Sequence, residues 1–178
     1  MILFNGDSWC YGYGLENRDD RYATLLSKKL NTDYIDLSTH GCSNRRIYRS
    51  TIMHDITKYE LGVICMTFKN RTEFHLNGKW ENINPGRGRG KKYIDYYRDY
   101  YSEEYGDSDE FIYRQAIIDH FKVNKVKLIL LTNTKNSRYH YDLNINTPDT
   151  PLGATLHPTK EGHGIIASKI YETYNKMV

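Results

Sequence analysis

Two apolar segments, residues 61–67 and 126–132, constrain the fold of this chain more than any other feature. Short runs rich in Leu, Val and Ile are typical of parallel strands that are buried on both faces. Residues 1–4 form a shorter apolar run, and residues 33–37 alternate as a strand does. Helical spacing of apolar residues occurs at about 19–30, 43–58, 109–122 and 159–177. This alternation predicts an α/β fold, a three-layer α/β/α sandwich around a mostly parallel sheet.

One segment, from about residue 76 to 107, interrupts this rhythm. It contains a basic, glycine-rich stretch at residues 85–92, which is followed by many tyrosines. Segments of this length without regular structure are usually functional or mobile. We therefore interpret residues 76–107 as an insertion over the ligand-binding crevice of one domain that spans residues 1–178. A chain of this length can bury a single core, and we see no repeat or second domain.

Charge and cysteine content give no support to several classes of function and argue against nucleic-acid binding. A net charge of +3 is too small to indicate nucleic-acid binding, and the three cysteines lack the spacing of a disulfide framework or a metal site. Neither a signal peptide nor an apolar run of the roughly 20 residues that span a bilayer is visible. We expect a cytoplasmic protein without a metal or a membrane contact; its oligomeric state is not predicted.

The first strand leads into a turn that presents a serine. Asn5-Gly6 is a turn signal directly after the apolar run, and Asp7-Ser8 follows. Open α/β sheets bind ligands in the crevice beyond the carboxyl ends of their strands, where Ser8 is expected. If a helix starts just after the turn, its free N–H groups face an anion that forms near Ser8. The motif is either a presented nucleophile or a polar turn.

Two further clusters follow predicted strands or precede a predicted helix. His40-Gly-Cys-Ser-Asn44 comes after the second strand, and residues 156–164, which include two histidines, come before the last helix. The carboxyl ends of parallel strands meet at one edge of the sheet. The residues expected to converge there are Ser8, Gly41, Asn44 and His157.

Taken in order, these motifs resemble the SGNH (GDSL-like) hydrolase family. The landmarks lie at residues 6–8, 41–44, about 67–73 and 157–163, so the resemblance spans nearly the whole chain. It implies the flavodoxin-like SGNH fold and a serine hydrolase that needs no cofactor. Within that pattern Ser8 is the nucleophile and His157 its general base, and the backbone N–H groups of Ser8 and Gly41 form part of the oxyanion hole.

The chemistry explains why these residue types are needed. A serine hydroxyl is a poor nucleophile until a base within hydrogen-bond reach takes its proton. Histidine suits this role because its unperturbed pKa is near 6.5, and such a base contributes roughly 10²–10⁴-fold in rate. A glycine at position 41 lets the backbone approach the substrate without a Cβ in the way.

The chain departs from the family pattern at the third oxyanion donor. The family usually supplies an Asn from a Gly-x-Asn-Asp motif, but residues 66–73 read Met-Thr-Phe-Lys-Asn-Arg-Thr-Glu. The candidates are Asn44, Asn70 and Thr67. We favour Asn44, because Gly-x-x-Asn at a helix start aims the amide towards the crevice.

Small SGNH-like proteins of phage genomes carry a similar Arg-x-Glu after this strand, and the chain resembles them most. Arg71 then either binds an anionic part of the substrate or forms a structural pair with Glu73. His40, next to Gly41, is expected near the site. The predicted binding residues are Asp7, His40, Thr67 and Arg71.

A second departure concerns the acid of the triad. The family places an aspartate three residues before the histidine, where this chain has Ala154. In a serine protease, replacing that aspartate lowers kcat by about 10⁴. Possible substitutes are Asp149, Asp142, a backbone carbonyl near residue 154 or an acid of the insertion, and some family members are thought to use a Ser–His dyad. His163 is expected to be structural.

These observations lead to two main hypotheses. The first is a serine hydrolase that cleaves a small-molecule or carbohydrate ester, an acetyl esterase or deacetylase that forms an acyl-Ser8 intermediate. The second is a catalytically weakened binding or virion protein that recognises a nucleotide or sugar, in the host cytoplasm or the virion if a phage encodes it. A weaker third reading is a nucleic-acid binder that uses the basic stretch with its tyrosines.

Overall fold

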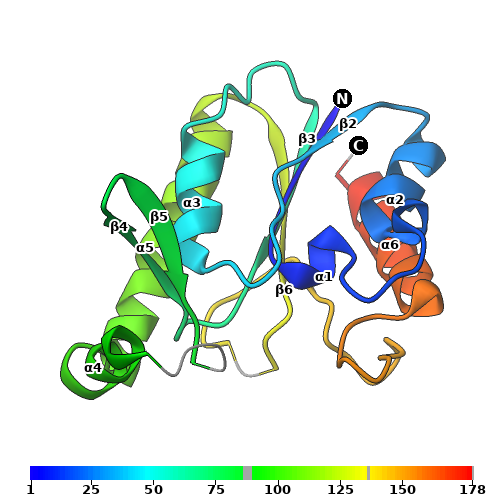
Figure 1. The fold of residues 1–178 in the computed structure, drawn as a ribbon. Helices are drawn as coiled ribbons and strands as arrows, with labels where there is room; N and C mark the ends of the chain where they lie inside the picture. The colour runs from blue at the N-terminus through cyan, green and yellow to red at the C-terminus, as the bar shows by residue number, and fades with distance from the viewer. Residues whose placement is uncertain (86–89, 136, 178) are drawn as a thin grey trace.

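The computed structural model describes residues 1–85, 90–135 and 137–177. Within these parts, a five-stranded sheet lies at the centre, with the strand order β2-β1-β3-β6-β7 and every pair parallel (Figure 1). The strands are β1 (Ile2–Asn5), β2 (Tyr34–Asp36), β3 (Leu61–Met66), β6 (Lys127–Thr132) and β7 (Leu143–Asn144). All four predicted strands are present, and the short β7 adds an edge that was not predicted.

Helices cover both faces of this sheet. They are α2 (Tyr22–Leu30) and α6 (Lys160–Asn175) on one face, and α3 (Asn44–Ile52) and α5 (Glu103–Val123) on the other (Figure 1). A hydrophobic core lies on each face of the sheet. Consecutive residues of β3 pack into these two cores alternately, because strand side chains alternate between faces. Val63 packs with the α2–α6 layer and Ile64 with the α3–α5 layer. The predicted three-layer α/β/α sandwich is confirmed.

Two helix boundaries differ from the prediction. The helix expected at 43–58 ends at Ile52, because Asp55 accepts a hydrogen bond from the backbone N–H of Thr57 and forms a turn instead. The helix expected at 109–122 begins earlier, at Glu103, where the Ser102 side chain caps it. In the described parts of the chain, none of the helices has the length and apolar character needed to cross a membrane.

The segment 76–107 is largely folded. Strands β4 (Thr72–Leu76) and β5 (Lys79–Ile83) form an antiparallel hairpin, and helix α4 (Lys91–Asp99) follows. Asn77 and Gly78 join the strands with φ of 50° and 78°. Asn-Gly with positive φ at both positions is the preferred two-residue hairpin turn, so the sequence did carry this signal. Arg87 and Arg89 of the basic stretch lie outside the described residues.

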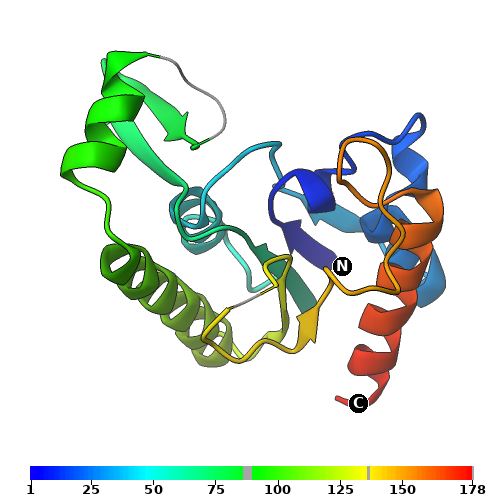
Figure 2. The same cartoon turned by 90° about the horizontal axis from the view of Figure 1, so that it is seen from below.

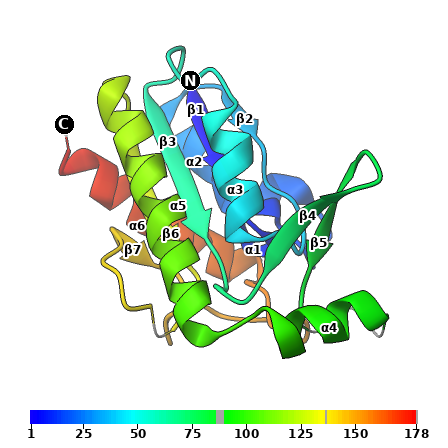
Figure 3. The ribbon, with the colours of Figure 1, turned by 90° about the vertical axis from the view of Figure 1, so that its left-hand side faces the viewer.

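The hairpin and α4 stand on the α3–α5 side of the molecule, as Figures 2 and 3 show. The guanidinium of Arg49 in α3 lies over the Trp80 ring, 4.1 Å from its centroid. In α4, Tyr97 donates a hydrogen bond to the backbone carbonyl of Asn70 at 2.6 Å. These contacts attach the segment beside the carboxyl end of β3. That it lies over the crevice stays a prediction.

Candidate active site

Ser8 lies just beyond the carboxyl end of strand β1, at the start of the short helix α1 (Ser8–Tyr11). The chain turns there across β3 so closely that only a glycine fits at position 6. A Cβ on Gly6 would lie 2.9 Å from the Cβ of Cys10 and 3.0 Å from that of Cys65. The Asp7 side chain then caps α1 by accepting from the N–H of Trp9 at 3.0 Å. The turn fixes Ser8 at the edge of the sheet formed by the carboxyl ends of the strands, where the residue is 3 % exposed.

His157 is in direct contact with this serine. Its Nε2 lies 2.8 Å from the Ser8 Oγ, although the two residues are 149 positions apart. Its Nδ1 lies 2.7 Å from the backbone carbonyl oxygen of Thr155. A carbonyl oxygen can only accept, so Nδ1 carries the proton and the lone pair of Nε2 faces the serine hydroxyl. This arrangement can take the proton of Ser8.

The loop that carries His157 is closed on itself just before α6. The N–H of Gly153 donates to the carbonyl of His157 at 2.8 Å, and the N–H of Thr159 donates to the carbonyl of Pro151 at 2.9 Å. A cavity of about 380 Å³ lies between this loop and residues 14–16. The imidazole is therefore held between a short self-bonded loop and the serine.

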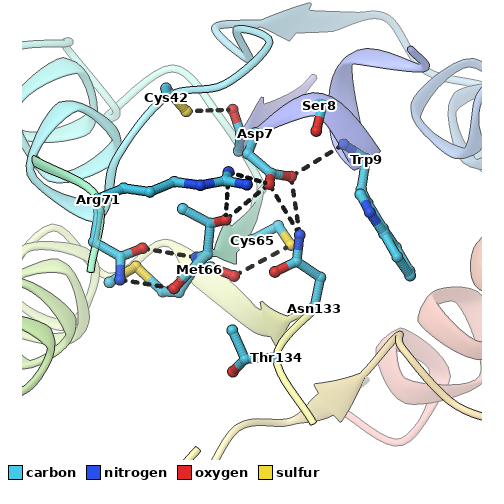
Figure 4. A network of polar contacts seen from close by, with 12 residues as sticks. Asp7, Ser8, Trp9, Cys42, Cys65, Met66, Arg71, Asn133 and Thr134 are labelled. Atoms are coloured by element: carbon cyan, nitrogen blue, oxygen red, sulfur yellow. Dashed lines mark hydrogen bonds and ion pairs between the residues drawn. The ribbon is translucent and has the colours of Figure 1, made fainter. Parts of the chain in front are cut away.

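Asp7 is the centre of a buried polar network on the other side of Ser8 (Figure 4). Its side chain is 1 % exposed and accepts from Thr67 Oγ1 at 2.8 Å and from Arg71 Nη1 at 3.1 Å. Asn133 Nδ2 donates to both carboxylate oxygens, at 3.1 and 3.0 Å. Together with the N–H of Trp9, donors from the ends of β3 and β6 and from α1 fix the residue that precedes the nucleophile.

Sequence reasoning missed Asn133. This residue is 1 % exposed and follows β6 directly. A polar residue at the end of a buried parallel strand is the same signal that pointed to Ser8, so the pattern was available. That Asn133 would bond to Asp7 could not be predicted, because the two residues are 126 positions apart and meet only where the loops after β1 and β6 come together.

Gly41 lies in the loop after β2 with a φ of 70°, a conformation that favours glycine. That loop is tied to the Ser8 turn, since Thr39 N–H and the Cys42 thiol both donate to the Gly6 carbonyl, at 3.1 and 3.3 Å. Among the described residues, the backbone N–H groups of Ser8 and Gly41 have no hydrogen-bond acceptor. Within the described structure these two donors are unused, and the loop of Gly41 is bonded to the turn that carries Ser8.

The prediction that the Asn44 amide points towards the crevice is wrong. Its Nδ2 donates to the carbonyl of Thr67 at 2.9 Å, and its Oδ1 accepts from the N–H of Thr67 at 2.7 Å. Asn44 thus secures the end of β3, where the chain has no further sheet partner. Thr67 itself belongs to the Asp7 network. Asn70 lies in the following loop, and its contact with Tyr97 is through the backbone.

Of the two alternatives for Arg71, the structural pair with Glu73 is wrong. Strand β4 lies against α3, so Glu73 meets Arg49 and accepts from its Nε and Nη2 at 2.7 and 3.0 Å. Arg71 pairs with Asp7 instead, and its guanidinium packs over the Phe68 ring, 4.6 Å from the centroid. Arg71 is thus placed at the site; that it binds substrate stays a prediction.

Asp149, the candidate acid, does not lie beside His157. Its side chain is 78 % exposed and its carboxylate lies 3.5 Å from the Lys169 ammonium. The other candidate, Asp142, accepts from the N–H of Leu130 at 2.6 Å. Of the substitutes considered, the structure favours a backbone carbonyl, that of Thr155.

The remaining histidines have distinct places. The His40 ring stacks on Tyr13 with 4.1 Å between centroids, and its centroid lies 6.3 Å from that of His157. His163 is fully buried in α6, and its Nδ1 accepts from the N–H of Tyr22 at 3.1 Å. Burial, with the nearby positive charge of Arg21, lowers the pKa of His163 to about 4. His40 lies at the site, whereas His163 is a neutral packing residue.

No cysteine competes with Ser8 as a nucleophile. Burial raises the pKa of the Cys10 and Cys65 thiols well above the usual value and that of Cys42 to about 12. A thiol needs its thiolate form to attack, so these three are inert. Among the described residues, no group of three or more His, Cys, Asp or Glu side chains could hold a metal ion.

The sequence matches no family model and no curated protein. Solved structures do match. An esterase, EstA from Pseudoalteromonas sp., aligns with a TM-score of 0.56 and 14% identity over 99% of this chain and 97% of that one. A putative lipolytic protein of the G-D-S-L family from Desulfitobacterium hafniense aligns with a TM-score of 0.60 and 11% identity, over 97% and 98%.

A third similar structure is a family two carbohydrate esterase from Clostridium thermocellum in complex with cellohexaose. It aligns with a TM-score of 0.60 and 15% identity, over 99% of this chain and 64% of that one. These likenesses establish the fold. The chain has the single-domain, flavodoxin-like α/β/α fold of the SGNH and GDSL-type esterases.

Proposed function

We propose that the protein is a serine-dependent ester hydrolase. The observation that carries this proposal is the contact of 2.8 Å between the Ser8 Oγ and the Nε2 of His157. The imidazole is in the tautomer that accepts a proton, and among the described residues the N–H groups of Ser8 and Gly41 have no acceptor. The esterase names of the structural neighbours support the same class of reaction.

The reaction follows from these positions. As the Ser8 Oγ attacks the carbonyl carbon of the ester, its proton passes to His157 Nε2. The negative charge on the former carbonyl oxygen faces the N–H groups of Ser8 and Gly41, and each donor of this kind is worth on the order of 10²–10³ in rate. The imidazolium then protonates the leaving alkoxide. Water, deprotonated by the same histidine, then attacks acyl-Ser8, and the acid leaves as the imidazolium returns the proton to the Ser8 oxygen.

The substrate we propose is a small-molecule or carbohydrate ester with a short acyl group such as acetyl. An acetyl or acyl esterase, or deacetylase, fits a nucleophile that is only 3 % exposed and is flanked by the His40, Tyr13 and His157 rings. A carbohydrate alcohol is supported by the neighbour that was solved with cellohexaose.

The test is hydrolysis of p-nitrophenyl acetate by the purified protein. We expect turnover that Ser8→Ala abolishes without lowering the melting temperature. Ser168→Ala makes the same chemical change on α6, outside the site, and should keep full activity. Equal activity in wild type and Ser8→Ala would refute the proposal.

A second candidate function is favoured by one observation, the support of His157 by a carbonyl instead of a carboxylate. A neutral acceptor stabilises imidazolium less well, which fits a weakened enzyme that binds a nucleotide or sugar without efficient turnover. In that case a nucleotide or sugar raises the melting temperature while the hydrolysis of acetyl esters stays at background. Turnover that depends on Ser8 would exclude it.

A further inference from the structure

A cavity of about 480 Å³ lies beyond the Asp7 network, on the side away from His157. It opens between the loop after β3, the start of α5 and the loop after β6. Two of its lining residues, Phe68 and Thr134, directly follow the Asp7 partners Thr67 and Asn133. Figure 4 shows Thr134 beyond Asn133 as seen from Ser8. The cavity is therefore adjacent to the candidate active site and separate from the cavity beside His157.

The residue that best indicates a ligand is Glu110, on the α5 wall of this cavity. It is 5 % exposed, and its Oε1 accepts from Tyr141 Oη at 2.6 Å and from Ser137 Oγ at 2.9 Å. Among the described residues, its Oε2 has no hydrogen-bond partner. Glu110 lies on the cavity wall, so this oxygen can accept a hydrogen bond from a ligand hydroxyl.

The other charges of the cavity neutralise one another. Lys69 Nζ lies 2.8 Å from a Glu103 oxygen and 2.6 Å from an Asp107 oxygen, and Arg138 lies 2.9 Å from the second Asp107 oxygen. With Lys135 and Glu110, the lining holds three basic and three acidic side chains. A strongly charged ligand would find no excess of the opposite charge. A neutral ligand with many hydroxyl groups would find donors and acceptors of both kinds.

Aromatic and amide groups complete the lining. Phe68 is 42 % exposed, and Tyr101, Asn70 and Asn146 also face the cavity. An exposed ring gives the C–H faces of a sugar an apolar surface, while amides and carboxylates bond its hydroxyls. A long acyl chain would instead have to bury charged groups against hydrocarbon, which is unfavourable.

We propose that this cavity binds a neutral polyhydroxylated ligand, a sugar or a comparable polyol, with Glu110 Oε2 accepting a hydrogen bond from one ligand hydroxyl. Its role in catalysis rests on the proposed function, because the polyol is then the part of the ester that does not react. Binding energy from such a remote part positions the scissile bond at Ser8.

The first experiment measures binding without hydrolysis. Ser8→Ala protein is titrated with methyl glycosides of glucose, galactose, xylose and N-acetylglucosamine while its backbone amide resonances are followed by NMR. We expect at least one glycoside to shift resonances around residues 68–70 and 134–138. No shift with any glycoside, or shifts only with inorganic phosphate, overturns the proposal.

Glu110→Gln, made in the same protein, tests the contact itself. Glutamine keeps an acceptor for Tyr141 and Ser137 but turns the cavity-facing oxygen into a donor, so the fold should be retained. We expect affinity to fall by about tenfold or more, as for one hydrogen bond to a charged group. Glu172→Gln, the same change on α6, is the control. Equal affinity in the Glu110 variant overturns the proposal.

A kinetic measurement separates the two proposals. Wild type, Glu110→Gln and Glu172→Gln are compared on p-nitrophenyl acetate and on an acetylated methyl glycoside. The ratio of kcat/KM for the glycoside to that for p-nitrophenyl acetate should fall about tenfold in the Glu110 variant only. An unchanged ratio refutes the subsite. If wild type hydrolyses neither ester, the proposed function fails, and the NMR titration still decides whether the cavity binds a polyol.

Discussion

The two sides of Ser8 are held very differently. On one side, Asp7 is buried and accepts hydrogen bonds from Trp9, Thr67, Arg71 and Asn133, which come from three parts of the fold (Figure 4). On the other side, His157 has one bond to the serine and one to the carbonyl of Thr155 in its own loop. The nucleophile is fixed by many donors, whereas the base is oriented by one neutral acceptor.

This difference indicates which property of the site each side controls. The Asp7 network fixes the turn that carries Ser8, so substitutions in this network should mainly lower the free energy of unfolding. The His157 loop supplies the base for proton transfer, so substitutions there should mainly lower the rate of hydrolysis. Because a carbonyl stabilises the imidazolium less than a carboxylate does, the base is the weaker side of the site.

The largest expected effect is the loss of the base. His157→Ala should lower kcat/KM for p-nitrophenyl acetate by about 10³-fold, since a positioned general base contributes roughly 10²–10⁴-fold. Its melting temperature should stay close to that of the wild type. His54→Ala, at the far end of the sheet, is the matched control. A His157 variant within about threefold of wild type would show that the imidazole is not the base.

Removing Asp7 should act mainly on stability. Asp7→Ala leaves the Arg71 charge buried without its partner, which costs about 3–5 kcal/mol of unfolding free energy. Urea denaturation measures this directly. The double variant Asp7→Ala/Arg71→Met should recover much of the loss, because it removes the unpaired charge as well. A single variant that loses less than about 1 kcal/mol would contradict the structural role of the network.

His163 extends the comparison to pH. Its pKa of about 4 in the folded protein lies below the value near 6.5 expected in the unfolded chain. Below pH 6.5 the unfolded chain therefore binds more protons, and stability is lost as the pH falls towards 4. The loss from this residue is about 3 kcal/mol between pH 7 and pH 4.

Urea denaturation of wild type and His163→Gln across this pH range measures the effect. Glutamine is neutral at all these pH values and still offers an acceptor to the N–H of Tyr22. The variant should therefore lose less stability than wild type on acidification. Parallel curves for the two proteins would mean that His163 does not titrate as its burial indicates.

The smallest expected effect comes from giving His157 a stronger hydrogen-bond partner. Ala154→Asp places a carboxylate three residues before His157, where it can replace the Thr155 carbonyl as the partner of Nδ1. We expect kcat to rise by about tenfold, because a charge-assisted hydrogen bond is roughly twice as strong as a neutral one. Ala154→Asn is the neutral control. Equal kcat in the two variants would show that the carbonyl already suffices.

The sequence predicted the part of the site that follows from strand ends. Short apolar runs predicted the parallel strands, and their carboxyl ends placed Ser8, Gly41 and His157 near one another. The Asn77-Gly78 pair also carried the hairpin signal, although the segment was interpreted as a loop. These features depend on local patterns and on the topology of a parallel sheet.

The hydrogen-bond partners of individual side chains could not be predicted from the sequence. Asn44 turns to the backbone of Thr67, and Arg71 turns to Asp7 instead of Glu73. Such choices depend on how two loops meet in space, and neither spacing nor composition contains that information. The partner of His157 was predicted only in part, since a backbone carbonyl near residue 154 was one of several candidates and the sequence could not choose among them.

The most direct test of the central claim, that Ser8 is a nucleophile activated by His157, is covalent trapping. Wild type, Ser8→Ala and His157→Ala are incubated with a fluorophosphonate, and the modified residue is identified by mass spectrometry. The structure predicts one adduct on Ser8, none in Ser8→Ala and much slower labelling in His157→Ala. An adduct elsewhere, or equal labelling of all three proteins, would contradict it.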